Sequence, residues 1–207
     1  FDTSFYLEHS PDVEKKNISP LLRFFKWGAS EKRSPHPLFD VPYYLSQDPE
    51  IRDKKTNPVV HYLLFGARKG LNPHRLFNTA YYLKNYPDVE QQKINPLVHF
   101  LLFGFRENRN PHPHFHTKIY KELHELKDDT NPLLDFIEHP DKSPNPWFSS
   151  SYHVINNPHI VQKRYNPFIH SLYGDYRTSL TLPANSQKGL SSLKRIHSSS
   201  SNKPLIY

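Results

Sequence analysis

The sequence has 207 residues, a formal net charge of +7 and 36% hydrophobic residues, a composition that excludes an intrinsically disordered chain despite its 20 prolines. It contains no cysteine, which excludes disulfide bonds and thiolate chemistry, and its longest apolar runs are far too short to span a bilayer. Because the chain begins without methionine and without a secretory signal pattern, we interpret it as a piece of a longer protein.

A repeat of 38 residues organises most of the sequence. The segment LFDVPYYLSQDPEIRDKKTNPVVHYLLFGARKGLNPH (38–74) matches LFNTAYYLKNYPDVEQQKINPLVHFLLFGFRENRNPH (76–112), and another copy opens the chain. A shortened fourth copy begins at Phe115, and a fifth begins at Phe148 and fades after Gly174. We predict one helical repeat domain over residues 1–183, with copies one to five near 1–38, 39–76, 77–114, 115–147 and 148–183.

Each copy is predicted to begin with a short helix. Asp2, Asp40 and Asn78 are good N-cap residues, and each directly precedes an apolar-aromatic stretch. Pro42 falls in the first turn of its helix, where a missing N–H costs nothing. The following PDV or DPEI segment is expected to end this helix or to start another short turn.

A second helix is marked more strongly in each copy. It starts at a capping residue followed by proline, as in Asn57-Pro58 and Asn95-Pro96, with Asn131-Pro132, Asn166-Pro167 and Ser19-Pro20 in the other copies. Gly28, Gly66 and Gly104 are expected to supply left-handed C-caps.

The second helix of copy three is apolar almost all the way round, which predicts burial on most sides. Helices this short are marginal alone, so the copies are expected to stack. The predicted fold class is therefore all-α, an α-solenoid of helix pairs, with an irregular helical bundle as the alternative. Leu64 and Leu102 lie on a face that is charged in copies one and four. We expect them to be core, and a docking patch is the alternative.

Three histidines at alternate positions, His112, His114 and His116, invite a zinc-site interpretation. However, His36, His74 and His112 occupy one repeat position, and the other two histidines replace ordinary residues. Equivalent residues of stacked copies lie roughly 8–10 Å apart, too far to share an ion. We predict loop histidines and no metal site. There is also no phosphate-binding loop or nucleophile motif, so no catalytic residue and no cofactor are predicted.

The turns after the repeat glycines are rich in cations. In stacked copies these turns would line one edge that binds a modest anion, and the predicted binding residues are Arg33, Arg68, Lys69, Arg106 and Arg109. A solvated turn is the alternative. The last 24 residues carry four of the positive charges and no acid, which leaves only +3 on the first 183. A solenoid that grips nucleic acid would be more basic, so no nucleic-acid partner is expected.

Residues 184–202 are Ser-rich and basic, typical of a linker. The final KPLIY, residues 203–207, is predicted to begin a following α/β domain.

The pattern FD-x3-YYL-x3-PDV followed by NPL-x-HFLLFG-x-RE-x-R-NPHPLF resembles a helical repeat found beside catalytic domains of bacterial surface-polysaccharide enzymes. These include glycosyltransferases of rhamnan and O-antigen (lipopolysaccharide) assembly and capsule-polymer synthases. The resemblance covers residues 1–112 well and 113–180 poorly. It implies a spacer, oligomerisation or acceptor-polymer-binding module in the cytoplasm, near the inner face of the membrane.

We therefore expect a non-catalytic module of a polysaccharide-synthesising transferase. Its expected partners are the acceptor chain or a neighbouring catalytic domain, with homo-oligomerisation and peripheral membrane association as further expectations. The alternative is a stand-alone solenoid that binds nucleic acid or another polyanion. An enzyme in its own right is a third possibility, for which the sequence offers no catalytic constellation.

Overall fold

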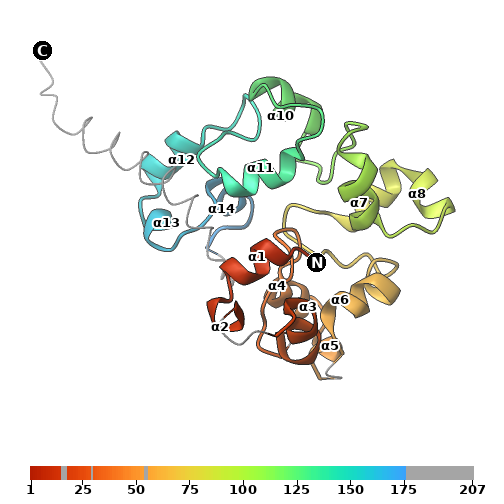
Figure 1. The fold of residues 1–207 in the computed structure, drawn as a ribbon. Helices are drawn as coiled ribbons and strands as arrows, with labels where there is room; N and C mark the ends of the chain where they lie inside the picture. The colour runs from red at the N-terminus through yellow and green to blue at the C-terminus, as the bar shows by residue number, and fades with distance from the viewer. Residues whose placement is uncertain (15–17, 29, 54–55, 176–207) are drawn as a thin grey trace, which may run out of the picture. The chain divides into compact units, whose positions relative to one another are not determined.

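The computed structural model describes residues 1–175 except 15–17, 29 and 54–55 (Figure 1). Within these ranges the chain is helical and has no sheet, only isolated two-residue β-bridges. The all-α prediction is confirmed. The described residues form two compact units, Phe1–Leu134 and a second that starts at Asp135, so the division falls inside one helix of copy four.

Copies one to three contain three short helices each rather than two, because the segment around PDV forms a helix of its own. The elements of these copies are α1 (Thr3–Glu8), α2 (Pro11–Glu14), α3 (Pro20–Arg23) and η1 (Phe24–Gly28); α4 (Val41–Ser46), α5 (Pro49–Asp53), α6 (Pro58–His61) and η2 (Tyr62–Gly66); α7 (Thr79–Asn85), α8 (Pro87–Gln91), α9 (Pro96–His99) and η3 (Phe100–Gly104).

Copies four and five follow the same order with fewer parts. Copy four has α10 (Thr117–Leu123) and α11 (Pro132–Glu138), and copy five has α12 (Ser150–Asn156), α13 (His159–Gln162) and α14 (Pro167–Tyr173). The deletion in copy four removes the middle helix.

The predicted helix starts are confirmed by side-chain hydrogen bonds. The Asp40 carboxylate accepts from the Tyr43 N–H at 3.0 Å, and Asn57 Oδ1 accepts from the N–H groups of Val59 and Val60 at 3.0 and 3.3 Å. These bonds satisfy amide groups that have no partner inside the helix. Ser19 makes no such bond, although Pro20 still opens α3.

The prediction that the repeat glycines are left-handed C-caps is wrong. In each of copies one to three the third helix continues as a π-helical turn that ends on the glycine, and none of these glycines has a positive φ. The left-handed residue comes four positions later, at Lys32, Gly70 and Asn108, with φ of 58°, 74° and 56°.

Close contact with a tyrosine explains why glycine stands at these positions. A Cβ on Gly66 would lie 1.9 Å from the hydroxyl oxygen of Tyr44, and one on Gly104 would lie 2.1 Å from that of Tyr82. The same tyrosines bond the histidines of the third helix, with 2.7 Å from the Tyr44 hydroxyl to His61 Nδ1. The glycine therefore leaves room for the side chain that joins the first helix to the third.

Copies two and three each have a small aromatic core. In copy two Phe39, Tyr44 and Tyr62 are buried, and their ring centroids lie 5.2 to 5.7 Å apart. Copy three repeats this arrangement with Phe77, Tyr82 and Phe100. Tilted and edge-on contacts of this kind stabilise a pair by about 1 kcal/mol beyond area burial. The second tyrosine of each YYL is thus a core residue.

The prediction that the third helix is buried on most sides is also wrong. Leu64 is 55% exposed and Leu102 is 52% exposed, and neighbouring apolar residues are exposed as well. The helix is only two turns long, and Tyr62 and Gly66 already turn one side of it toward α4. The residues on the other side therefore reach solvent.

A closing loop returns each copy to its own start. The N–H of Asp40 donates to the carbonyl of Pro73 at 2.9 Å, and the N–H of Leu76 donates to Nδ1 of buried His74 at 3.1 Å. A β-bridge between His74 and Phe77 then leads into the next copy. Equivalent bonds form at His36 and His112. The repeated histidine is therefore an acceptor that shapes the loop, buried at His74 and His112 and half-buried at His36.

The predicted linker at 184–202, the predicted domain start at 203–207 and the end of copy five lie outside the described residues. In the described part of the chain, no helix has the length and apolar character that crossing a membrane requires.

Candidate functional site

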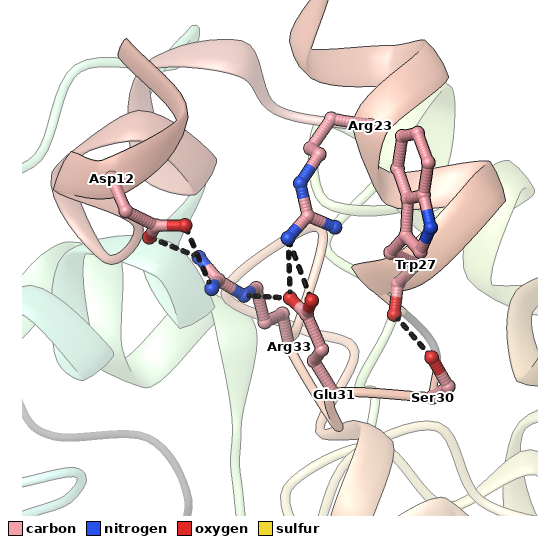
Figure 2. Close-up of polar contacts among 6 residues, drawn as sticks. All are labelled: Asp12, Arg23, Trp27, Ser30, Glu31 and Arg33. Carbon is pink, nitrogen blue, oxygen red and sulfur yellow. Dashed lines mark hydrogen bonds and ion pairs between the residues drawn. The ribbon is translucent and has the colours of Figure 1, made fainter. Parts of the chain in front are cut away.

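The structure divides the five predicted binding residues into paired and unpaired groups. Arg33 belongs to the paired group (Figure 2). Its guanidinium donates to both carboxylate oxygens of Asp12, at 2.5 and 3.0 Å, and its Nε lies 2.7 Å from Glu31. The buried Arg23 donates to the same Glu31 carboxylate at 2.6 and 2.9 Å. The two cations and two carboxylates leave no net charge for an anionic ligand.

Hydrogen bonds from these guanidiniums lower the pKa values of the acids in this network. The bonds from Arg33 lower the pKa of Asp12, and those from Arg23 are the main cause of the lowered pKa of Glu31. Both acids therefore stay ionised at neutral pH, and Arg33 ties the α2 segment to the turn after Gly28.

Arg109 makes the equivalent ion-pair staple in copy three, that is, an arginine of the turn after the repeat glycine that bonds an acid of the middle helix and an acid of its own turn. It donates to the carboxylate of Asp88 at 2.8 Å and to Glu107 at 2.5 Å, and its guanidinium stacks over the Tyr86 ring at 5.0 Å. One cation and two carboxylates give this cluster a net negative charge, which disfavours an anion. Arg33 and Arg109 hold the fold of their copies together.

Copy two lacks this staple because Leu71 stands at the arginine position. Lys69 stands where the other copies have Glu31 and Glu107, and its ammonium lies 3.9 Å from Asp48. This exposed contact is weak.

Arg106 and Arg68 share one repeat position but differ in their surroundings. Arg106 donates to the carbonyl of Leu102 at 2.6 Å and stacks over the Phe105 ring at 4.5 Å. Arg68 is exposed, and no ion pair of Arg68 is seen within the described ranges. Of the five predicted residues, Arg68 is therefore the one best placed to meet a ligand.

Arg68 lines a pocket of about 430 Å³ between η2 and the helices of copy three. The other lining residues are Leu63, Ala67, Leu83, Glu90, Lys93, Ile94, Asn95 and Pro96. This volume is within the range of small-ligand sites, about 300–1,000 Å³. The pocket combines an apolar wall with two cations and one carboxylate, which suits a ligand that has an apolar face and a negative group.

Sequence reasoning missed Lys93, the second cation of the pocket. It follows α8 and adopts a left-handed conformation with φ of 56°. A positive φ is uncommon outside glycine, and nothing in the residue type indicates it. Only the packing of copy three beside Arg68 shows that the two cations line the same pocket.

The histidines of the NPHPHFHT segment are used by their own loop. His112 Nδ1 accepts from the N–H of His114 at 3.2 Å, and His116 Nδ1 lies 3.3 Å from the side-chain amide of Asn110. These bonds support the interpretation of the segment as a repeated loop. Comparison with protein-family models, with curated proteins and with solved structures found no match to this chain.

Proposed function

We propose that this chain is a non-catalytic helical repeat module of a bacterial polysaccharide-synthesising transferase, and that it holds an anionic acceptor chain. The pocket beside Arg68 carries this proposal. Its two cations have no ion pair with a carboxylate within the described ranges, and they lie at the rim of an apolar wall. The resemblance of the repeat sequence to that of surface-polysaccharide enzymes is the support for this polymer class and for a location in the cytoplasm beside the membrane.

A uronic-acid residue fits this pocket chemically. Its C–H faces can pack on Leu63, Leu83 and Ile94, and its carboxylate can bond the guanidinium of Arg68. Asn95 and Glu90 offer partners for hydroxyl groups. No nucleophile or acid–base pair is needed, because the role is to bind the chain and not to react with it.

We also propose that copies one to three stack in solenoid fashion. Val59 packs against the core cluster of Tyr6, Val13 and Phe24 in copy one, and the Tyr62 hydroxyl lies 3.2 Å from Thr79 Oγ1 in copy three. Both contacts join neighbouring copies.

Binding to polygalacturonate, with neutral dextran as a comparison, tests the acceptor role. The double variant Arg68→Ala/Lys93→Ala should weaken binding at least tenfold, because it removes both cations of the pocket. Isothermal titration calorimetry at two salt concentrations measures the change.

The matched control is Lys84→Ala/Lys127→Ala, which removes two exposed cations outside the pocket. It should change affinity by no more than about twofold, since only diffuse charge is lost. Equal weakening by both double variants would mean that the protein binds polyanions through net charge alone. A tighter and steeply salt-dependent affinity for single-stranded DNA would favour the nucleic-acid alternative.

Self-association is a second candidate role, favoured by the exposed apolar residues of the third helices. Leu64, Phe65, Leu102 and Phe103 are each more than half exposed. Light scattering should show a concentration-dependent oligomer that the variant Leu64→Gln/Leu102→Gln reduces to monomer. A monomer in the unchanged chain at all concentrations would refute this role.

A further inference from the structure

The first and third helices of copy five meet through residues that differ from those of copies two and three. At the position of Tyr44 and Tyr82 copy five has His153, and at the position of Gly66 and Gly104 it has Asp175. His159 stands at the position of Glu50 in α5 and Asp88 in α8. His170 stands at the position of the third-helix histidines of copies two and three. Four equivalent positions thus carry metal-ligand residue types in this copy.

The two exchanges at the tyrosine and glycine positions are linked sterically. In copies two and three a tyrosine hydroxyl fills the space where a side chain on the glycine would begin. Histidine has no hydroxyl at that reach, so this contact does not exclude a side chain at position 175 of copy five.

The resulting side chains converge. His159 Nε2 lies 3.0 Å and His170 Nε2 lies 3.3 Å from Asp175 Oδ1. The three ligand atoms all lie within 4.8 Å of one another, and in the described part of the chain this is the group of three that meets that spacing. Ligands of a tetrahedral zinc ion are each about 2.0–2.2 Å from the metal, so they lie roughly 3.4 Å apart. The observed separations need little adjustment.

A further histidine orients the group. His153 Nε2 lies 2.9 Å from His170 Nδ1, the ring nitrogen on the side away from Asp175. Metal-bound histidines characteristically have their second nitrogen held in this way, which fixes the ring. The side chain of His170 is only 10% exposed, whereas His159 and Asp175 are accessible to solvent.

We propose that His159, His170 and Asp175 bind a divalent transition-metal ion of the zinc class, with His153 positioning His170. Two imidazoles and one carboxylate are ligands that suit zinc, and the fourth position stays open to water. The ion would fasten α13 to the segment that follows α14. This site is independent of the proposed acceptor pocket.

One contact opposes the ion and makes the proposal testable. The Lys163 ammonium lies 2.6 Å from the other oxygen of Asp175, so its charge repels a cation bound to that carboxylate. The variant Lys163→Ala should therefore tighten zinc binding severalfold. Unchanged or weaker binding in this variant would contradict Asp175 as a ligand.

The main experiment is titration of the metal-free full chain with Zn²⁺, followed by calorimetry, and with Co²⁺, followed by its visible absorption. We expect one ion per chain and a melting temperature that rises with zinc. His159→Gln and Asp175→Asn should each weaken binding at least tenfold, and both residues are exposed enough to be replaced without loss of folding.

The chain offers a matched control. His139 and Lys142 both contact Asp135, at 3.3 and 2.7 Å, but among the described residues no second histidine completes that group. His139→Gln should leave zinc affinity unchanged. If His159→Gln and Asp175→Asn bind zinc as the parent does, or if replacing His112, His114 and His116 abolishes binding instead, the proposed site is wrong.

Discussion

Lowering the pH from 7 to 5 should destabilise the protein by several kcal/mol, because three loop histidines, His74 and His112 buried and His36 half-buried, resist protonation. Burial lowers the pKa of His74 to about 3 and the pKa values of His36 and His112 to about 4. A proton on Nδ1 would also displace the backbone N–H that this atom accepts, as from Leu76 to His74. The folded state therefore keeps these rings neutral.

The direction follows from proton binding in the two states. An unfolded histidine has a pKa of about 6.5, so below that value the unfolded chain binds protons that the folded chain does not. Above about pH 6.5 the neutral histidines cost the folded state nothing. The free energy of unfolding then decreases as the pH falls toward the folded-state pKa values of about 3 to 4. At pH 5 each histidine should cost about 2 kcal/mol. Urea unfolding followed by circular dichroism at pH 7.5, 6 and 5 measures the slope.

Copy four supplies the control. Asn145 replaces the histidine there, and its Oδ1 accepts from the N–H of Trp147 at 3.0 Å without titrating in this range. The triple variant His36→Asn/His74→Asn/His112→Asn should therefore flatten the slope between pH 6.5 and 5. The variant should still lose stability at lower pH, where Asp12 and Glu31 become protonated, because the pKa values of these two acids lie below their usual range. An unchanged slope between pH 6.5 and 5 would show that other groups govern the acid response.

The variant Gly66→Ala should destabilise the protein by about 3 kcal/mol, as expected for overpacking of a close contact. The new Cβ would stand 1.9 Å from the Tyr44 hydroxyl oxygen, so the tyrosine would have to move and lose its bond to His61. Tyr44→Phe alone should cost about 1 kcal/mol for the lost hydrogen bond. Chemical denaturation of the two single variants and the double variant gives the coupling between the residues.

The double variant should be more stable than the sum of the single effects predicts, because phenylalanine removes the blocking oxygen. Rescue should be partial, since Tyr44 Cζ remains 3.1 Å from the new Cβ. Gly70→Ala is the control: its φ of 74° makes alanine unfavourable by about 1 kcal/mol, but the nearest atom is Ala80 Cβ at 3.8 Å. Tyr44→Phe should not alter that cost. Strict additivity at Gly66 would mean that the glycine is needed for its backbone freedom.

Local signals in the sequence determined where helices begin. Caps such as Asp40 and Asn57 act within three residues of themselves, so they work in nearly any tertiary context. The helical class and the buried aromatic positions follow from the same repeated pattern. The ion pair of Arg33 with Asp12 could not be predicted in this way, because the two residues are twenty-one positions apart in sequence.

The tertiary structure alone decided what each repeated residue does. The sequence pattern predicted that Gly66 is a helix C-cap. Its actual role is to leave room for the hydroxyl of Tyr44, which belongs to another helix. The sequence pattern predicted that Leu64 is a core residue, but it is exposed because only one side of this two-turn helix is covered. The pocket cation Lys93 and the convergence of His159 with Asp175 depend on distances between segments that no periodicity specifies. Sequence patterns report the contacts of neighbours along the chain, whereas binding sites arise where packing brings distant residues together.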